Sequence, residues 1–229
     1  MQQLQSGRHF LQIPGPTNVP DRILRAIERP TIDHRGPEFK GLCFEVLEGI
    51  KEIFQTKEPV IIYPASGTGA WEAALVNTHS SGERVLMYDT GHFASTWYKL
   101  AIKLGLDAQL LPGSWREGVR PDEIEQALSE DKERNIKSVC VVHNDTATGI
   151  TSDIPAIRKA IDKSGHNALL CVDTISSLGS IDYRHDDWGV DVTVGGSQKG
   201  LMMPPGLSFN AVSKKALEAC ESANLPSSY

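Results

Sequence analysis

Lys199 is the residue whose surroundings in this sequence best suit chemistry. It stands in the stretch VDVTVGGSQKGLMMPPG, after an apolar run with strand-like alternation and before a second apolar segment, residues 201–205. An ammonium group beside an apolar wall is partly desolvated, which lowers its pKa and favours the neutral, nucleophilic amine. Gly195, Gly196 and Gly200 allow backbone or a ligand to approach closely. The stretch favours a reactive lysine, although most loop lysines are solvated surface charges.

An acid and an anion-binding sequence accompany this lysine. Asp173 ends the apolar run NALLCVD, where an unpaired buried carboxylate would be costly, so we expect it to have a cationic partner. A cap for the following turn is the alternative role. The sequence SGTG, from Ser66 to Gly69, leads into the helical pattern AWEAALV and offers free backbone amides at the positive end of a helix dipole. Ordinary N-capping by Ser66 or Thr68 is the alternative there.

Together, the lysine, the acid and the helix start meet the needs of pyridoxal 5′-phosphate. The amine bonds to the aldehyde, the acid holds the pyridinium nitrogen and the helix start binds the phosphate. A charge-assisted hydrogen bond from the pyridinium nitrogen to the acid contributes about 1.5–3 kcal/mol. A dinucleotide fingerprint is the rival interpretation, because Gly67 and Gly69 follow a strand and Asp89 lies roughly 20 residues further on. Glu72, at the third small position, argues against it.

Strand-length apolar runs alternate with helical patterns along the chain. We expect strands at 59–63, 84–88, 107–111, 137–142, 167–172, 190–194 and 206–211, and helices at 69–78, 92–104, 121–130 and 153–164. This alternation predicts an α/β fold with a mostly parallel central sheet and helices on both faces. Small, polar or charged residues directly follow five of the strands. Because ligands bind at the carboxyl ends of such strands, we expect the five loops to form one crevice.

Composition narrows the function classes. A chain of 229 residues can form one large domain or two small ones, and a net charge of −6 without a basic cluster argues against nucleic acid as a partner. The sequence shows no signal-peptide pattern and no apolar run near the roughly 20 residues of a membrane span, so we expect a soluble, cytoplasmic protein. The four cysteines have no C-x-x-C spacing and the histidines no H-x-x-x-H pair, which predicts free thiols and no metal site.

Six stretches identify a resemblance to a known family. They are PGPTNVP, IDHRGPEF, SGTGAWEAALVNT, HNDTATG, ALLCVDTISSLGSIDYRHDDWGVDV and GSQKGLMMPPGLSF. In order and composition they resemble the class V, fold type I pyridoxal-phosphate aminotransferases, most closely the serine-glyoxylate and alanine-glyoxylate branch. The resemblance runs from about residue 10 to the end of the chain. It implies that Lys199 bonds covalently to the cofactor and moves the substrate proton, and that Asp173 holds the pyridine nitrogen.

The resemblance also implies which residues surround the cofactor and substrate. The cofactor-binding set comprises Ser66, Gly67, Thr68, Phe93, Thr148, Asp173, Gln198 and Lys199. In this set Thr148 would bond one edge of the cofactor and Phe93 would stack on the ring, with His92 as the alternative stacking residue. Roles in the core for Phe93, in a turn for Thr148 and at the surface for Gln198 stay open. The substrate end would be lined by Pro14, Gly15 and Pro16.

Two features depart from the family pattern. Asp145 stands in HNDTATG where the family leads us to expect glutamate, which keeps the charge but shortens the reach. The family also continues into a smaller C-terminal domain, which supplies an arginine for the substrate carboxylate and closes the neighbouring subunit's phosphate site. We therefore divide the chain into an N-terminal arm and first helix, 1–40, and a cofactor-binding large domain, 41–229. Alone, the chain is expected to bind cofactor weakly and to catalyse poorly.

The function expected from the resemblance is transfer of an amino group to glyoxylate, giving glycine and a 2-oxo acid. Serine is the first choice of donor, with alanine or aspartate as alternatives, and the full-length protein is expected to be a homodimer, with a peroxisomal location left open. A cysteine desulfurase is a second class, but those enzymes have a histidine before the lysine where this chain has Gln198, and Cys220 lies in a surface-helix pattern. A non-catalytic binding or dimerisation module would leave the pairing of Asp173 with Lys199 unexplained.

Overall fold

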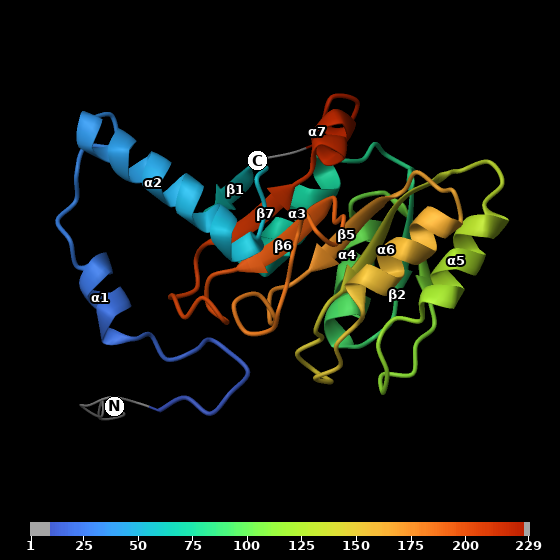
Figure 1. The fold of residues 1–229 in the computed structure, drawn as a ribbon, viewed down its shortest axis with the longest axis horizontal. Coiled ribbons are helices and arrows are strands. Elements are labelled where there is room, and N and C mark those ends of the chain that lie inside the picture. The colour runs from blue at the N-terminus through green and yellow to red at the C-terminus, as the bar shows by residue number, and fades with distance from the viewer. Residues whose placement is uncertain (1–9, 227–229) are drawn as a thin grey trace.

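A seven-stranded sheet lies at the centre of the computed structural model, which describes residues 10–226 (Figure 1). The strands are ordered β1-β7-β6-β5-β4-β2-β3. Their bounds are β1 Val60–Tyr63, β2 Arg84–Tyr88, β3 Asp107–Leu111, β4 Ile136–Val142, β5 Leu169–Asp173, β6 Val192–Gly196 and β7 Ser208–Val212. Within this sheet β7 runs antiparallel to β1 and β6, and the other neighbouring pairs are parallel. The mostly parallel sheet expected from the sequence is confirmed.

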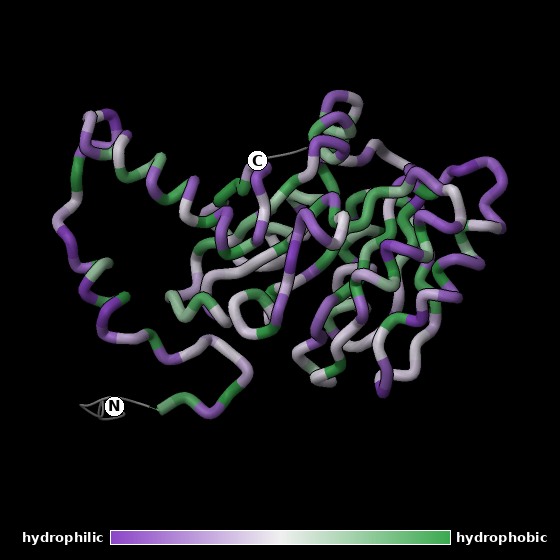
Figure 2. The backbone as a smooth tube through the Cα atoms, in the orientation of Figure 1, coloured by the Kyte–Doolittle hydropathy of each residue, from purple (hydrophilic) through white to green (hydrophobic). Residues whose placement is uncertain are grey.

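Helices cover both faces of the sheet. One face carries α3 Gly67–Val76, α4 His92–Lys103 and α7 Lys214–Cys220, and the other carries α5 Pro121–Glu130, α6 Ile154–Lys163 and the end of α2 Pro37–Phe54. Along β2, Val85 and Met87 pack on the face that carries α3, α4 and α7, while Leu86 and Tyr88 pack on the opposite face. Figure 2 shows the hydrophobic strands between more hydrophilic outer helices. This two-sided burial explains the continuous apolar runs of the sequence.

The strand that precedes Lys199 begins two residues later than expected. We predicted a strand at 190–194 with alternating faces, but β6 spans Val192–Gly196 and all its residues are buried. Asp191, expected on a polar face, is buried as well. Its carboxylate accepts hydrogen bonds from Leu170 N at 2.8 Å and Ser213 Oγ at 2.8 Å, so it ties neighbouring segments together. Residues 208–212, not 206–211, form the last strand.

Helix bounds agree closely with expectation, except near the N-terminus and in α3. The latter begins at Gly67 rather than residue 69, because Ser66 already has the extended backbone of an N-cap. In the N-terminal region α1 spans Asp21–Ile27, and α2 begins at Pro37 and so crosses the expected boundary at residue 40. Residues 1–9 of the expected arm lie outside the described part of the chain.

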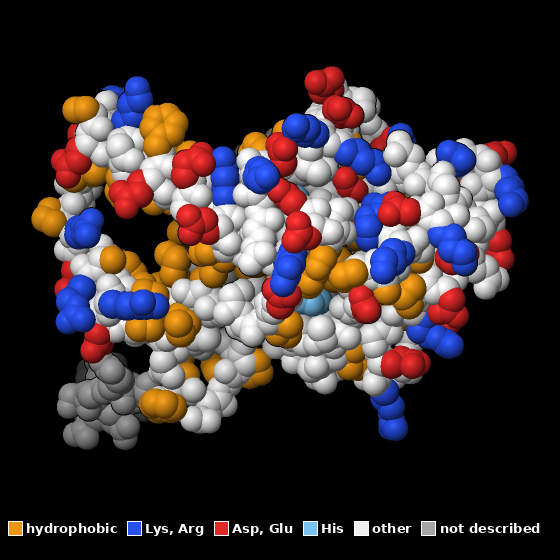
Figure 3. Space-filling view, in the orientation of Figure 1, with side chains coloured by type: hydrophobic (Ala, Val, Ile, Leu, Met, Phe, Trp, Pro, Cys, Tyr) orange, Lys and Arg blue, Asp and Glu red, His pale blue; other side chains and the backbone are white. Residues whose placement is uncertain are grey.

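The two N-terminal helices are mostly not buried against the rest of the domain. No residue of α1 is buried, and in α2 the buried residue is Phe54 at its end. Figure 1 shows both helices extending away from the sheet, and Figure 3 shows hydrophobic side chains gathered around them. Among the described helices, none combines the length and apolarity that a bilayer span requires. All four cysteines are free; Cys140 and Cys171 are buried and Cys220 is exposed.

Candidate active site

The loops after β1, β2, β4, β5 and β6 surround one cavity of about 150 Å³. Its lining consists of Ser66, Gly67, Thr68, Trp71, Phe93, Asn144, Thr146, Asp173, Ile175, Ser176, Gln198 and Lys199. These loops meet because the carboxyl ends of parallel strands lie at one edge of the sheet. The expected crevice is therefore present, and seven of the eight residues predicted to bind cofactor line it.

Lys199 faces the N-terminal segment of the chain. Its Nζ donates a hydrogen bond to Pro14 O at 2.8 Å, and Thr17 N donates to Gln198 O at 3.0 Å. Burial lowers the pKa of Lys199, and the charge of Asp173 opposes that shift. Gly15 has a φ of +145°, and a Cβ there would lie 2.6 Å from the lysine Nζ. A residue without a side chain is therefore required where this segment crosses the amine.

The apolar surroundings predicted for Lys199 were partly wrong. Segment 201–205 does not line the cavity; Leu201 packs against the α5 and α6 core, and Met202 is 37% exposed. The space beside Gly195 is taken by Phe54 and Leu178, so that glycine serves packing within the protein rather than ligand access. The N-terminal segment and the residues that line the cavity thus surround Lys199 in place of the expected apolar wall.

Asp173 is buried at the end of β5, with 3% of its surface exposed. Its Oδ1 accepts a hydrogen bond from Ile175 N at 2.7 Å, and its Oδ2 accepts one from Trp71 Nε1 at 3.0 Å. Burial raises the pKa of Asp173 to about 7, while these two bonds and the charge of Lys199 pull the other way. The carboxylate thus caps the next turn, which is the alternative role considered from the sequence, and it also lines the cavity, where its role toward a cofactor stays a prediction.

The N-terminus of α3 is left uncapped toward the cavity. Ser66 makes no side-chain capping bond, so ordinary N-capping by Ser66, the alternative raised by the sequence, is not seen. The first-turn amides therefore remain available to an anion. Gln198 Oε1 is buried without a partner beside this turn, and a half-turn of the amide would present its N–H groups instead. This donor set suits a phosphate.

Phe93 and Thr146 face the cavity, whereas His92 and Thr148 do not line it. His92 is exposed, so Phe93 is the aromatic residue placed to contact a bound ring. The hydroxyl of Thr148 donates to Thr90 O at 3.3 Å and accepts from Ile150 N at 3.4 Å, and the second of these bonds is the turn role left open from the sequence. Thr146 was missed, because spacing alone cannot tell which threonine of HNDTATG points inward. Trp71, Asn144, Ile175 and Ser176 were also missed as lining residues.

Asp145 caps α4 from across the sheet edge. Its Oδ2 accepts hydrogen bonds from Phe93 N at 3.1 Å and Ala94 N at 3.3 Å, and its Oδ1 accepts one from Ala147 N at 3.0 Å. A Cβ at Gly91 would lie 2.5 Å from the carboxylate carbon. The shorter acid therefore fits closely against a residue without a side chain, and it fixes the helix turn that carries Phe93.

Replacement of Asp145 by alanine is expected to lower the free energy of unfolding by about 1–3 kcal/mol, because it removes a buried charged acceptor from three amides. Urea denaturation measures this loss. Asp153→Ala is the matched control, since Asp153 caps α6 through Ala156 N away from the cavity. Weaker binding of pyridoxal phosphate is expected for the Asp145 variant alone; equal weakening in both variants would contradict the placement of Phe93 by Asp145.

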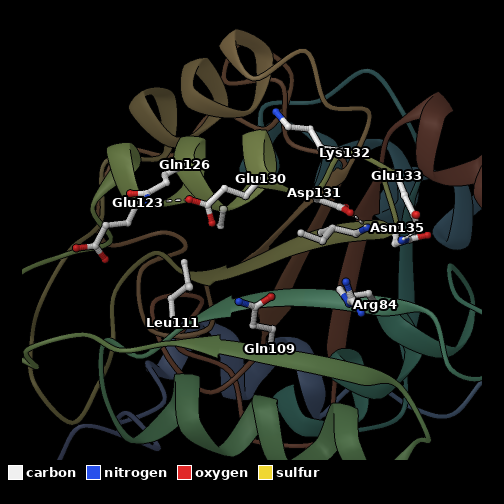
Figure 4. A pocket seen from close by; sticks show the side chains of 12 residues that line it. Arg84, Gln109, Leu111, Glu123, Gln126, Glu130, Asp131, Lys132, Glu133 and Asn135 are labelled. Atoms are coloured by element: carbon white, nitrogen blue, oxygen red, sulfur yellow. Dashed lines mark hydrogen bonds between the residues drawn. The ribbon is translucent and has the colours of Figure 1, made fainter.

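A larger and more open hollow lies between α5 and the β2–β3 edge of the sheet (Figure 4). Its walls mix acids, bases and amides, as in the bond from Gln126 Nε2 to Glu130 Oε1 at 2.8 Å. Arg84 in this hollow pairs with Asp107 at 2.8 Å. None of the predicted site residues lines it. Within the described residues, no group of three or more His, Cys, Asp or Glu side chains is arranged to hold a metal ion.

The fold and this cavity together define the large domain of a fold type I transferase, with its lysine, acid and helix start at the carboxyl ends of the strands. The chain belongs to the class V aminotransferase family, whose model matches residues 9–228.

Several similar proteins are named as aminotransferases that use glyoxylate. The chain is 49% identical over 216 residues to the serine–glyoxylate aminotransferase of Methylorubrum extorquens, covering 94% of this chain and 54% of that protein. It is 47% identical over 218 residues to the L-aspartate–glyoxylate aminotransferase of Paracoccus denitrificans, covering 95% and 55%. The crystal structure of an alanine–glyoxylate aminotransferase from Nostoc sp. superposes with a TM-score of 0.88 at 30% identity, covering 97% and 58%. The chain thus spans about half the length of the curated relatives it matches.

Proposed function

We propose that this chain carries the cofactor-binding part of a pyridoxal-phosphate aminotransferase that moves an amino group from a small amino acid, serine first, to glyoxylate. The observation that carries the proposal is the meeting of Lys199, the buried Asp173 and the uncapped start of α3 around one cavity. An isolated lysine or acid would have a simpler structural role. The combination matches the aldehyde, ring nitrogen and phosphate of a single cofactor.

The residues around the cavity fit pyridoxal phosphate. Ser66, Gly67 and Thr68 would hold its phosphate with Gln198, whose buried amide oxygen lacks a partner. Asp173 would face the ring nitrogen, since a cation there relieves the cost of burying its charge. When bound, the cofactor supplies a ring that accepts electrons from the substrate α-carbon.

Lys199 would then act as the group that holds the cofactor and, once freed, moves a proton at the substrate α-carbon. Its lowered pKa favours the neutral amine that both tasks require. Pro14 and Gly15 lie against the lysine side chain, where they would limit the space for a substrate. Pro16 follows them in the same segment and is exposed.

Serine is the proposed donor, and aspartate is the second candidate. Serine–glyoxylate aminotransferases of three organisms are 42–49% identical to the chain, and the aspartate–glyoxylate enzyme is 47% identical. Alanine is the third. Because these donors differ only in a small side chain, contacts of a few kcal/mol decide among them.

A cysteine desulfurase activity has less support. No cysteine is among the residues that line the Lys199 cavity, and Cys220 borders a separate apolar cavity beside α7. Solved desulfurase structures are 18% and 13% identical to this chain, which shows a shared fold alone. A purely binding or dimerising module would give no reason for Asp173 and Lys199 to line one cavity with the start of α3.

The test compares amino donors, using the full-length protein loaded with pyridoxal phosphate. Serine, alanine and aspartate are mixed singly with the protein, and conversion to the pyridoxamine form is followed by absorbance. Serine is expected to convert the cofactor fastest and to yield glycine when glyoxylate follows. Faster conversion by aspartate would reassign the donor, and no conversion by any of the three would refute the proposed function.

The same preparation tests the remaining expectations for the whole protein. We propose that it forms a homodimer in the cytoplasm, which light scattering and cell fractionation check. For the 229-residue chain itself we propose weak cofactor binding and poor catalysis. Transamination by that chain at ordinary enzyme rates would contradict this proposal.

A further inference from the structure

Trp71 links the two ends of the candidate cofactor site. It lies in α3, one turn after Gly67, and its Nε1 donates a hydrogen bond to Asp173 Oδ2 at 3.0 Å. Both side chains are buried, with 1% and 3% of their surfaces exposed. One short helix therefore offers its free amides to an anion and its indole N–H to the acid at the far side of the cavity.

Neighbouring rings hold the indole in this orientation. Trp71 stacks on Trp97 of α4, with ring centroids 5.7 Å apart and planes 11° from parallel. Phe93 meets its edge at 6.3 Å and 60°. Because aromatic stacking restricts the ring, the N–H has little freedom to turn away from the carboxylate.

The carboxylate is held from a second side as well. Ile175 N donates to Asp173 Oδ1 at 2.7 Å, so each oxygen has one fixed donor. A carboxylate has about four acceptor positions, which leaves acceptor capacity for a third donor from the cavity. The two donors thus determine from which direction a third donor can reach the carboxylate.

We propose that Trp71 is a positioning residue, whose N–H fixes the Asp173 carboxylate relative to the anion-binding turn of the same helix. The relation to pyridoxal phosphate rests on the proposed function, whereas the hydrogen bond itself does not. The distance between the phosphate-binding and ring-binding ends of the site is then set by α3 itself and by the hydrogen bond from Trp71 to Asp173.

Trp97 offers a matched control within the same stack. Its Nε1 is buried without a hydrogen-bond partner, so Trp97→Phe removes an indole without removing a bond and keeps an aromatic ring to stack on Trp71. Trp71→Phe removes the donor and keeps an aromatic ring. Placing benzothienylalanine at residue 71, which has sulfur where the indole has N–H, gives a second variant with the original shape.

The first measurement uses protein without cofactor. Carboxyl-carbon NMR follows the titration of Asp173, whose charged or titratable neighbours include Asp145, Lys199 and Tyr183. Loss of a donor to the charged form is expected to raise the pKa of Asp173 further in both residue-71 variants and to leave it unchanged in Trp97→Phe. Equal shifts in the Trp71 and Trp97 variants, or no shift in any of them, would overturn the proposal.

The second measurement is the dissociation constant of pyridoxal phosphate. We expect about tenfold weaker binding for both residue-71 variants, as for loss of one hydrogen bond to a charged group, and wild-type affinity for Trp97→Phe. Equal weakening in the Trp71 and Trp97 variants would count against the positioning role. If wild-type protein bound no cofactor at all, the proposed function would fail, while the titration would still decide whether Trp71 fixes Asp173.

Discussion

Lys199→Ala is expected to abolish the visible absorption band of the cofactor-loaded protein and to slow conversion by amino acids by at least about 10²- to 10⁴-fold, the usual contribution of a positioned proton-transfer group. The variant loses both the amine that bonds the cofactor and the base at the substrate α-carbon. Stability should change little, because the lysine is only half-buried and the hydrogen bond of its Nζ reaches the N-terminal segment. Stopped-flow absorbance with serine measures the effect.

Lys215→Ala is the matched control for this loss. Burial also lowers the pKa of Lys215, but its Nζ donates to Ala168 O at 2.9 Å, and the residue does not line the candidate site. The control should keep the visible band and the rate of conversion. A Lys199 variant with an unchanged band and rate would remove the basis for assigning the cavity to this cofactor.

Asp173→Asn is expected to weaken binding of pyridoxal phosphate by roughly 10- to 150-fold, because a hydrogen bond to a charged group contributes about 1.5–3 kcal/mol. The asparagine cannot hold a protonated ring nitrogen as a carboxylate does, so conversion of amino acids should slow as well. Equilibrium titration with the cofactor measures the affinity. Wild-type affinity in this variant would show that Asp173 does not face the bound ring.

The same variant isolates the pH dependence of stability without cofactor. Burial raises the pKa of folded Asp173 to about 7 from its usual 3.8, so the folded state keeps a proton that the unfolded chain releases. Wild-type protein should therefore lose stability relative to Asp173→Asn as the pH rises from about 4 to about 7, with a constant difference above that range. Urea denaturation across this range tests the sign, and a difference independent of pH would contradict the raised pKa.

The sequence predicted the sheet well because two-sided burial leaves a strong signal. Five of the seven strands are largely buried on both faces, whereas the edge strands β1 and β3 are only partly buried. The rule that ligands lie at the carboxyl ends of parallel strands placed five loops together. Asp173 and Lys199 could be singled out because each breaks an otherwise apolar context. The offset of β6 shows the limit of such patterns, since buried Asp191 mimics the polar face of a strand.

Long-range side-chain contacts could not be read from local patterns. Asp145 caps a helix that begins about fifty residues earlier in the chain, and Trp71 donates to Asp173, which lies 102 residues further along the chain. Asp145 stood out from the sequence only as a shorter acid than the family pattern has, and Trp71 looked like an ordinary member of a helix. Thr146 and Thr148 are separated by one residue, so only the fold of that turn decides which of them reaches the cavity.

The most direct test of the role of Lys199 is to map the site of cofactor attachment. Protein loaded with pyridoxal phosphate is reduced with borohydride, digested and analysed by peptide mass spectrometry. The reduced cofactor is expected on Lys199, with little label on Lys214 or Lys215 of α7. Attachment spread over surface lysines, or concentrated on any lysine other than Lys199, would contradict this role.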